Sequence, residues 1–131
     1  MGITRREKDC LAVIADEGSI KLTRLSKRLG IKPSTAYMLV KRLAGAGMVK
    51  RSKDGLVEMT RLGMEEEDGI RFRHRVIETL LARNGVGVKE ACSECNKLDF
   101  LISNKTAIKI FEKLREPGLC PHGKPIRPVR N

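Results

Sequence analysis

Four cysteines are the residues of this sequence with the clearest chemical potential: Cys10, Cys92, Cys95 and Cys120. Residues 1–7 lack the apolar core of a signal peptide, so we expect a cytoplasmic, reducing location. In such a compartment, thiols serve metal binding, redox sensing or core packing more often than structural disulfides. Cys92 and Cys95 stand three residues apart and would share one face of a helix. A single Cys-x-x-Cys is a weak motif by itself, so its meaning depends on the element that carries it.

The distribution of charge favours a polyanionic partner. The formal net charge is +11, from 27 Lys and Arg against 16 Asp and Glu. Residues 1–63 hold 14 basic and 6 acidic side chains, whereas residues 64–131 hold 13 and 10. DNA would favour a basic N-terminal half, because contacts with phosphates release condensed counterions. Charge alone is equally compatible with a solvated basic surface.

Length and hydropathy limit the classes of protein to consider. A chain of 131 residues can form one domain or two small modules. No apolar stretch approaches the roughly 18 residues that would span a bilayer, so we expect no membrane partner. The sequence contains no Gly-rich phosphate loop, nucleophile elbow or His-Glu-x-x-His pattern, and we therefore expect no enzyme.

Apolar periodicity in the N-terminal half predicts three helices. The first covers residues 3–15, the second is short and closes at Gly30, and the third begins after Pro33. Ser34 or Thr35 can cap the third helix, because their hydroxyls accept hydrogen bonds from main-chain N–H groups. The connection between the second and third helices is short enough for a helix-turn-helix.

A β-hairpin should follow these helices. Residues 53–55, Lys-Asp-Gly, separate the β-capable runs 48–52 and 56–59, which is a strong hairpin signal. The hairpin would be the wing of a winged helix-turn-helix, whose second paired helix enters the major groove while the wing contacts the backbone or minor groove. The predicted DNA-binding residues are Lys32, Ser34, Thr35, Tyr37, Met38, Lys41, Arg42, Arg51 and Lys53.

The C-terminal half predicts an all-helical module. From Thr60 the pattern is helical, with a loop-like break near residues 68–69 and an apolar face that ends at residues 84–85. Further helices are expected over residues 88–102 and, capped by Ser103, beyond it. The apolar faces are broad for so few residues, which favours a homodimer contact between helices.

The predicted fold is therefore mostly α-helical, with two domains. Residues 1–63 would form a winged helix-turn-helix of three helices and a β-hairpin wing. Residues 64–131 would form an all-helical dimerisation domain, in which Cys92, Cys95 and Cys120 could add metal sensing. The tail, residues 119–126, is too rich in Pro and Gly for regular structure.

Several short motifs carry a family resemblance. The most specific is the tail Cys120-Pro121-His122-Gly123-Lys124-Pro125-Ile126. The others are Leu29-Gly30, Val40-Lys41-Arg42-Leu43, Gly47-Met48-Val49, Met59-Thr60-Arg61-Leu62-Gly63 and Arg73-His74-Arg75. In this order they resemble the diphtheria-toxin-repressor family of iron- and manganese-responsive regulators. The resemblance covers nearly the whole chain but includes no counterpart of the SH3-like domain of some members.

The resemblance implies a dimer that binds operator DNA when metal occupies a pocket between the first helix and the helical module. His74 and Glu78 match a ligand pair of the family, and Asp9 lies where manganese-type members have an acidic ligand. The family's next four ligands, His, Cys, Glu and His, align with Cys92, Asn96, Asp99 and Phe100. Phe100 or Asn96 would weaken a site for a hard cation, which prefers oxygen ligands.

The thiols offer another ligand set for this pocket. A second alignment puts Cys92, Cys95 and Asn96 at the last three ligand positions, and four converging thiolates would suit an iron-sulfur cluster or zinc. Core packing is the alternative for Cys10, Cys92 and Cys95, and we expect His122 to hydrogen-bond within its turn rather than bind metal. The predicted ligands are Cys10, Cys92, Cys95 and Cys120, with Asp9, His74, Glu78 and Asp99 as the alternative divalent site.

These predictions combine into a DNA-binding transcriptional regulator, a repressor, whose operator binding is controlled by iron. The iron would be an iron-sulfur cluster or Fe²⁺, with zinc and manganese as alternatives. Site occupancy would lock the first helix against the helical module and so fix the spacing of two recognition helices. The alternatives are a metal-independent winged-helix repressor that answers another ligand and a protein-interaction module.

Overall fold

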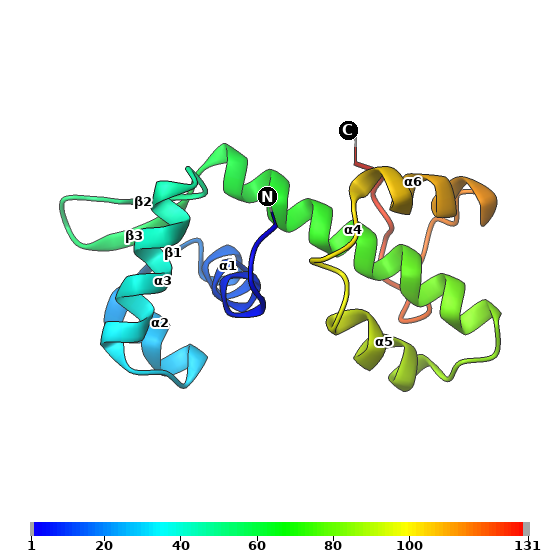
Figure 1. The fold of residues 1–131 in the computed structure, drawn as a ribbon, viewed down its shortest axis with the longest axis horizontal. Helices are drawn as coiled ribbons and strands as arrows, with labels where there is room; N and C mark the ends of the chain where they lie inside the picture. Colours follow the sequence, from blue (N-terminus) through cyan, green and yellow to red (C-terminus); the bar gives the residue numbers. More distant parts are fainter. Residues whose placement is uncertain (1, 130–131) are drawn as a thin grey trace. The chain divides into compact units, whose positions relative to one another are not determined.

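A computed structural model describes residues 2–129 of the chain. The elements, in chain order, are α1 (Arg5–Glu17), β1 (Ser19–Lys21), α2 (Leu22–Leu29), α3 (Pro33–Gly45), β2 (Val49–Arg51), β3 (Leu56–Met59), α4 (Arg61–Arg83), α5 (Val88–Asn96) and α6 (Asn104–Lys113) (Figure 1). They form a winged helix-turn-helix followed by a helical module, which confirms the predicted fold class. Two compact units divide between Glu67 and Asp68, within α4 and a few residues beyond the predicted boundary at residue 63.

Helix α1 owes its start to a capping box. The Thr4 hydroxyl accepts a hydrogen bond from the main-chain N–H of Glu7, and the Glu7 carboxylate accepts one from the N–H of Thr4. These two bonds satisfy N–H groups that have no partner within a first helical turn. The helix therefore begins and ends two residues later than predicted, and it buries Cys10, Leu11 and Ile14.

The helix-turn-helix forms as predicted, apart from its cap. Helix α2 ends at Gly30, which adopts the left-handed conformation that glycine tolerates best. Helix α3 begins at Pro33, and Lys32 precedes it without a side-chain cap. The prediction that Ser34 or Thr35 caps this helix is wrong, because Pro33 already has the φ angle of a first helical residue and the helix starts there.

A three-stranded antiparallel sheet replaces the expected two-stranded hairpin. Strands β2 and β3 pair as predicted, with Val49 opposite Met59. The additional strand β1 pairs with the other edge of β3, and the strand order is β1-β3-β2. Ile20 of β1 stands opposite Val57 of β3, and both side chains are buried. The extra strand thus attaches the wing to the segment that joins α1 and α2.

Helix α4 runs without a break through residues 68–69, so the predicted interruption there is wrong. A Cβ atom on Gly69 would lie 2.9 Å from Nη1 of Arg73 and 3.2 Å from Oδ1 of Asn104. Arg73 is itself buried, and its guanidinium donates hydrogen bonds to the main-chain oxygen of Asp99 and to the Asn104 side chain. Gly69 therefore makes room for a packed arginine and does not end the helix.

The C-terminal unit has its core between α4, α6 and the tail. The buried residues are Phe72, Val76, Ala107, Phe111, Cys120 and Ile126. The rings of Phe72 and Phe111 meet edge to face, with centroids 5.4 Å apart. This geometry suits aromatic quadrupoles and fixes the approach of α6 to α4.

Two features of this unit refine the predicted helices. Helix α5 ends at Asn96, earlier than the predicted residue 102, and turns lead to Ser103, which caps α6 as predicted by accepting a bond from the N–H of Thr106. The tail has neither helix nor strand, yet it is held by main-chain bonds from Cys120 to Lys124 and from Ile126 to Gly118.

Gly63 provides a test of close packing in the N-terminal unit. A Cβ atom there would lie 2.0 Å from the main-chain oxygen of Met48, so Gly63→Ala must displace backbone. We expect it to lower the free energy of unfolding by about 2 kcal/mol, although alanine favours helix. Gly45→Ala, where no atom lies within 4 Å of the new Cβ, should be neutral or stabilising. Urea unfolding followed by circular dichroism measures both, and equal effects would contradict the packing argument.

Candidate metal centre and nucleic-acid interface

Two groups of metal-ligating side chains share one buried carboxylate in the C-terminal unit. His74, Glu78 and Cys92 form one group, and Glu78, Cys120 and His122 form the other. Within each group, the ligand atoms lie within 4.8 Å of one another. Helix α4 supplies His74 and Glu78 one turn apart, α5 supplies Cys92, and the tail supplies Cys120 and His122. Three elements therefore meet around Glu78, which is only 1% exposed.

The Glu78 carboxylate faces two imidazoles, but its oxygen Oε2 accepts no hydrogen bond from either of them. Its Oε2 lies 3.5 Å from Nε2 of His74 and 3.1 Å from Nδ1 of His122. The same oxygen is buried and has no hydrogen-bond donor in suitable geometry among the described residues. A buried carboxylate is costly unless a cation or a donor compensates its charge. A metal ion between these groups would provide that compensation, so the donor set fits a cation.

Asp99 contacts the ring nitrogen of His74 that faces away from Glu78 and Cys92. Its Oδ2 lies 2.9 Å from Nδ1 of His74, while the other ring nitrogen, Nε2, lies 3.6 Å from Sγ of Cys92. A proton on Nδ1 that is donated to Asp99 leaves the Nε2 lone pair directed at Cys92 and Glu78, an arrangement common behind metal-bound histidines. Asp99 was expected as a direct ligand; it belongs to neither ligand group, and its contact with Nδ1 of His74 fits a positioning role.

Two thiols of this unit, Cys92 and Cys95, have raised pKa values. Burial raises the pKa of Cys92, and the negative charge of Glu78 raises it further. Burial raises the pKa of Cys95 to about 12, and Glu78 and Asp99 add to the effect. Cys95 is completely buried and belongs to neither ligand group, so its environment is that of a core residue.

The other predicted ligands lie in the N-terminal unit. Cys10 is completely buried on α1, where burial, followed by the charges of Glu7 and Asp9, raises its pKa to about 12. Asp9 is exposed and lines a pocket of about 250 Å³ together with residues of the turn between α2 and α3. Neither residue belongs to a ligand group among the described residues.

The site thus differs from the predicted one in composition. Cys92 and Cys120 of the thiolate set meet the same carboxylate, and His74, Glu78 and Asp99 of the alternative set lie together. The described residues include no group of four thiols, so the iron-sulfur prediction has no support in this ligand set. His122 was expected to bond within its turn, but it faces Glu78. Its position two residues after Cys120, in a tight turn, is the signal that could have identified it.

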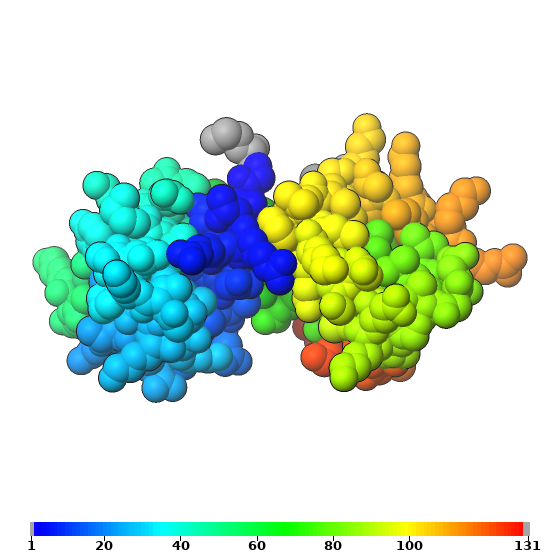
Figure 2. Space-filling model, turned by 60° about the horizontal axis from the view of Figure 1, so that its bottom comes forward, coloured from blue at the N-terminus to red at the C-terminus, as the bar shows by residue number. Residues whose placement is uncertain are grey.

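The predicted DNA-binding residues lie on the surface of α3 and the wing. All are exposed except Thr35, which is half-buried. Tyr37 and Met38 are 41% and 48% exposed, although both are large and apolar in part. The guanidinium of Arg51, on the wing, lies 5.3 Å from the centre of the Tyr37 ring, a cation-π distance that joins the wing to α3. The residues of α2 and α3, coloured cyan, form a continuous part of the surface in Figure 2.

Part of the N-terminal positive charge is already neutralised. Arg24 and Arg28 both pair with Glu17, at 3.0 Å, and Arg28 also pairs with Asp16 at 2.9 Å. Hydrogen bonds from the two guanidinium groups lower the pKa of Glu17. By contrast, the structure gives no carboxylate partner, among the residues it describes, to the cations Lys32, Lys41, Arg42 and Lys53. Helix α3 and the wing therefore include positive charge that no carboxylate among the described residues neutralises.

Comparison with known proteins agrees with this architecture. Residues 60–128, just over half of the chain, match the metal binding and dimerisation domain of iron-dependent repressors, and residues 3–55 match the MarR family. A helix-turn-helix-type transcriptional regulator of Aeropyrum pernix is 31% identical over 109 residues, which are 83% of this chain and 59% of that protein.

Two solved structures have the same fold over nearly all of this chain. A hypothetical protein of Sulfolobus solfataricus is 35% identical, with a TM-score of 0.88 and coverage of 95% of this chain and 99% of that one. A manganese-dependent transcriptional repressor in complex with manganese is 30% identical, with a TM-score of 0.73 and coverage of 92% and 57%. The chain therefore spans little more than half the length of this repressor and of the Aeropyrum relative.

The chain belongs to the iron-dependent repressor family of helix-turn-helix transcriptional regulators. This confirms the resemblance that the tail and helix motifs indicated. The family consists of transcriptional regulators and not of enzymes. None of the helices in residues 2–129 is long and apolar enough to cross a bilayer.

The role of Asp99 can be tested through metal affinity. We expect Asp99→Ala to weaken Zn²⁺ binding by about 10- to 100-fold, because His74 loses the partner that fixes its ring and proton. Asp99→Asn keeps an oxygen acceptor and should lose less. Glu94→Gln, an exposed carboxylate of α5 that pairs with Lys97, is the matched control and should not change the affinity. Competition with a chelating dye measures all three, and an unchanged affinity in Asp99→Ala would refute the positioning role.

Proposed function

We propose that this protein regulates transcription by binding operator DNA with an affinity set by a divalent metal ion. The ligands would be His74, Glu78, Cys92, Cys120 and His122. The observation that carries this proposal is the buried Glu78 carboxylate, which faces two imidazoles and lacks a hydrogen-bond donor at Oε2. The family match to a metal binding domain and the likeness to a manganese-dependent repressor support it.

The donor set favours zinc or ferrous iron. Imidazole and thiolate ligands suit these borderline cations, whereas manganese prefers oxygen ligands. Glu78 supplies the carboxylate common to both groups. Cys92 supplies the sulfur of the group that contains His74, and Cys120 supplies the sulfur of the group that contains His122. Ferrous iron would agree with the metal expected from the sequence, but it would be bound by imidazole, thiolate and carboxylate ligands and not as an iron-sulfur cluster. A bound metal ion would contribute positive charge beside Glu78 and would fix the directions of the side chains that bind it.

The ligands would act by holding three elements of the C-terminal unit together. Glu78 and His74 belong to α4, Cys92 to α5, and Cys120 and His122 to the tail. Without a cation, the closed arrangement leaves the Glu78 charge poorly compensated, so it is less stable relative to looser ones. A cation that binds only the closed arrangement shifts the population toward it. A more rigid dimerisation unit would fix the spacing of two recognition helices to about one turn of DNA, roughly 34 Å.

A homodimer would complete the regulator. The matching family domain is one of dimerisation as well as metal binding. The C-terminal unit exposes several apolar side chains, among them Leu101 at 68%, Leu119 at 60% and Val88 at 39%. Large exposed apolar residues on one small unit favour burial against a second copy.

Metal control can be tested with a duplex selected from random DNA by the metal-loaded protein. Removal of metal should lower the affinity for this duplex at least about tenfold, and Glu78→Gln should abolish the difference because it removes the shared ligand charge. Glu112→Gln, an exposed carboxylate of α6, is the control that should respond as the unmodified protein does. Fluorescence anisotropy measures each affinity. Identical affinities with and without metal would favour a metal-independent regulator.

Base recognition by α3 can be tested with specific and unrelated duplexes. Thr35→Ala combined with Tyr37→Ala should weaken binding to the selected duplex by about 1–3 kcal/mol per lost base contact while changing unrelated duplexes little. Lys41→Gln, which removes a predicted phosphate contact, should weaken both duplexes to a similar extent. Equal losses on both duplexes for the Thr35 and Tyr37 double variant would exclude α3 as the base-reading helix.

A further inference from the structure

An arginine of the wing lies over an aromatic ring of helix α3. The central carbon of the Arg51 guanidinium, at the end of β2, is 5.3 Å from the centre of the Tyr37 ring. A cation within about 6 Å of a ring centre is attracted by the negative face of the ring. Both side chains are exposed, and Tyr37 lies on the face of α3 that also carries Met38 and Lys41. Arg51 therefore extends the exposed surface of α3, although it belongs to the wing.

The main chain that carries Arg51 is held in place by the sheet. Arg51 stands opposite Val57 of β3, and the Val57 side chain is completely buried. The main-chain N–H of Ser52 donates a hydrogen bond to the main-chain oxygen of Leu56, at 2.8 Å. The Ser52 hydroxyl in turn accepts a hydrogen bond from the N–H of Leu56, at 3.2 Å. Because the strand is fixed and the Tyr37 ring limits the directions open to the guanidinium, less conformational entropy is lost when Arg51 binds a ligand.

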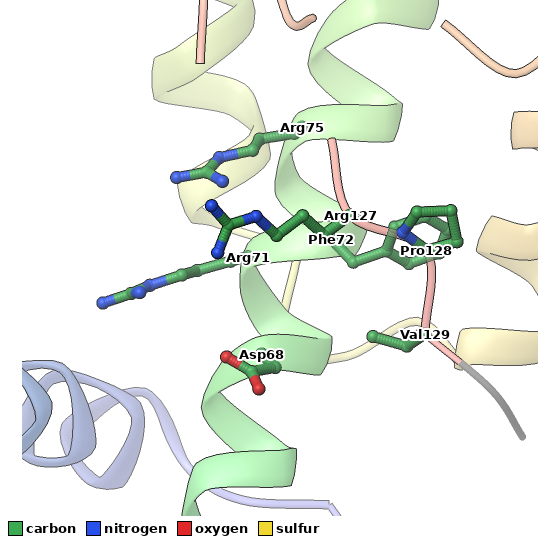
Figure 3. Close-up of a pocket in the computed structure, with 7 residues that line it drawn as sticks. All are labelled: Asp68, Arg71, Phe72, Arg75, Arg127, Pro128 and Val129. Atoms are coloured by element: carbon green, nitrogen blue, oxygen red, sulfur yellow. The ribbon is translucent and has the colours of Figure 1, made fainter. Parts of the chain in front are cut away.

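Arg51 keeps its hydrogen-bond donors available. Within residues 2–129, no oxygen accepts a hydrogen bond from its guanidinium, and no carboxylate forms an ion pair with it. Two arginines of the C-terminal unit differ in this respect. Arg75, beside the pocket drawn in Figure 3, donates to the main-chain oxygen of Pro125, and Arg83 donates to that of Leu114, both at 2.7 Å. A guanidinium has five N–H donors, and a contact with one ring cannot occupy all of them.

We propose that Arg51 reads a guanine of the operator in the major groove, and that Tyr37 is the positioning residue that holds Arg51 beside α3. This inference rests on the proposed DNA binding through α3 and deepens it by naming a base. Arginine forms paired hydrogen bonds to O6 and N7 of guanine, which lie at the major-groove edge. A wing arginine by itself would contact the backbone or the minor groove, whereas the Tyr37 ring keeps this one beside the helix that enters the major groove.

The first measurement replaces each guanine of the duplex selected by the metal-loaded protein with 7-deazaguanine, which lacks N7. At one guanine of each half-site, the unmodified protein should bind about tenfold more weakly, because a charge-assisted hydrogen bond is lost. Arg51→Lys keeps the charge but loses the planar fork, so its affinities for the normal and modified duplexes should agree within about twofold. Lys53→Gln, on the same wing, removes a predicted phosphate contact and should weaken both duplexes alike. Fluorescence anisotropy measures each affinity.

The second measurement tests the positioning role with Tyr37→Leu, which removes the ring and keeps an apolar side chain. It should reduce the effect of 7-deazaguanine to about twofold, while the slope of log affinity against log salt stays unchanged because no charge is lost. Tyr37→Phe keeps a ring and should retain the full effect. A merely structural role would change the affinities for both duplexes without changing their ratio. Circular dichroism checks that the variants are folded.

The outcomes separate this inference from the proposed function. A protein that selects no duplex contradicts the proposed function and this inference with it. A selected duplex in which no guanine responds to 7-deazaguanine overturns this inference alone, as does an Arg51→Lys variant that responds like the unmodified protein. An Arg51-dependent response to inosine only, which lacks the minor-groove amino group of guanine, would assign Arg51 to the minor groove and also overturn it. Full discrimination by Tyr37→Leu would refute the positioning role.

Discussion

The C-terminal unit depends on how the charge of one buried carboxylate is compensated. Glu78 is almost inaccessible, and an ionised carboxylate in that position destabilises the fold by several kcal/mol unless cationic groups surround it. The unit supplies two imidazoles to Oε2 and no donor in hydrogen-bond geometry. The His74 ring is in turn fixed by Asp99, and the tail is packed so that His122 reaches the same oxygen. The packing of α5 and the tail against α4 therefore determines both the stability of this unit and its capacity to hold a cation.

Local signals in the sequence were sufficient for most of the fold. Apolar periodicity, Gly30 and Pro33 located the helix-turn-helix, and the Asp-Gly turn located the wing. The strand β1 was missed because it has only three residues and gains its stability from pairing with β3, more than thirty residues away. The break predicted at Gly69 was wrong because a glycine within a helix can leave room for a packed side chain, and sequence alone does not show that Arg73 is buried against Gly69.

The candidate site was only partly accessible to the same reasoning. His74 and Glu78 were identified through a family resemblance, and their helical spacing agrees with the structure. The four cysteines are alike in sequence, but Cys10 and Cys95 are completely buried and belong to no ligand group among the described residues, whereas Cys92 and Cys120 meet Glu78. His122 was expected to bond within its turn, because a segment without helix or strand has no periodicity that shows which way a side chain points. Tertiary packing decides which thiol lies in the core and which lies beside Glu78, and the spacing of the cysteines along the sequence does not reveal that packing.

Several different contacts constrain the short tail, residues 119–126. Cys120 and Ile126 face the core and His122 faces Glu78, while main-chain bonds close the turn between Cys120 and Lys124. An inserted or deleted residue would shift all of these side chains together, because the main-chain bonds between Cys120 and Lys124 fix the length of the turn. We therefore expect this segment to accept substitutions at its outward positions more readily than any change in its length, although it has neither helix nor strand.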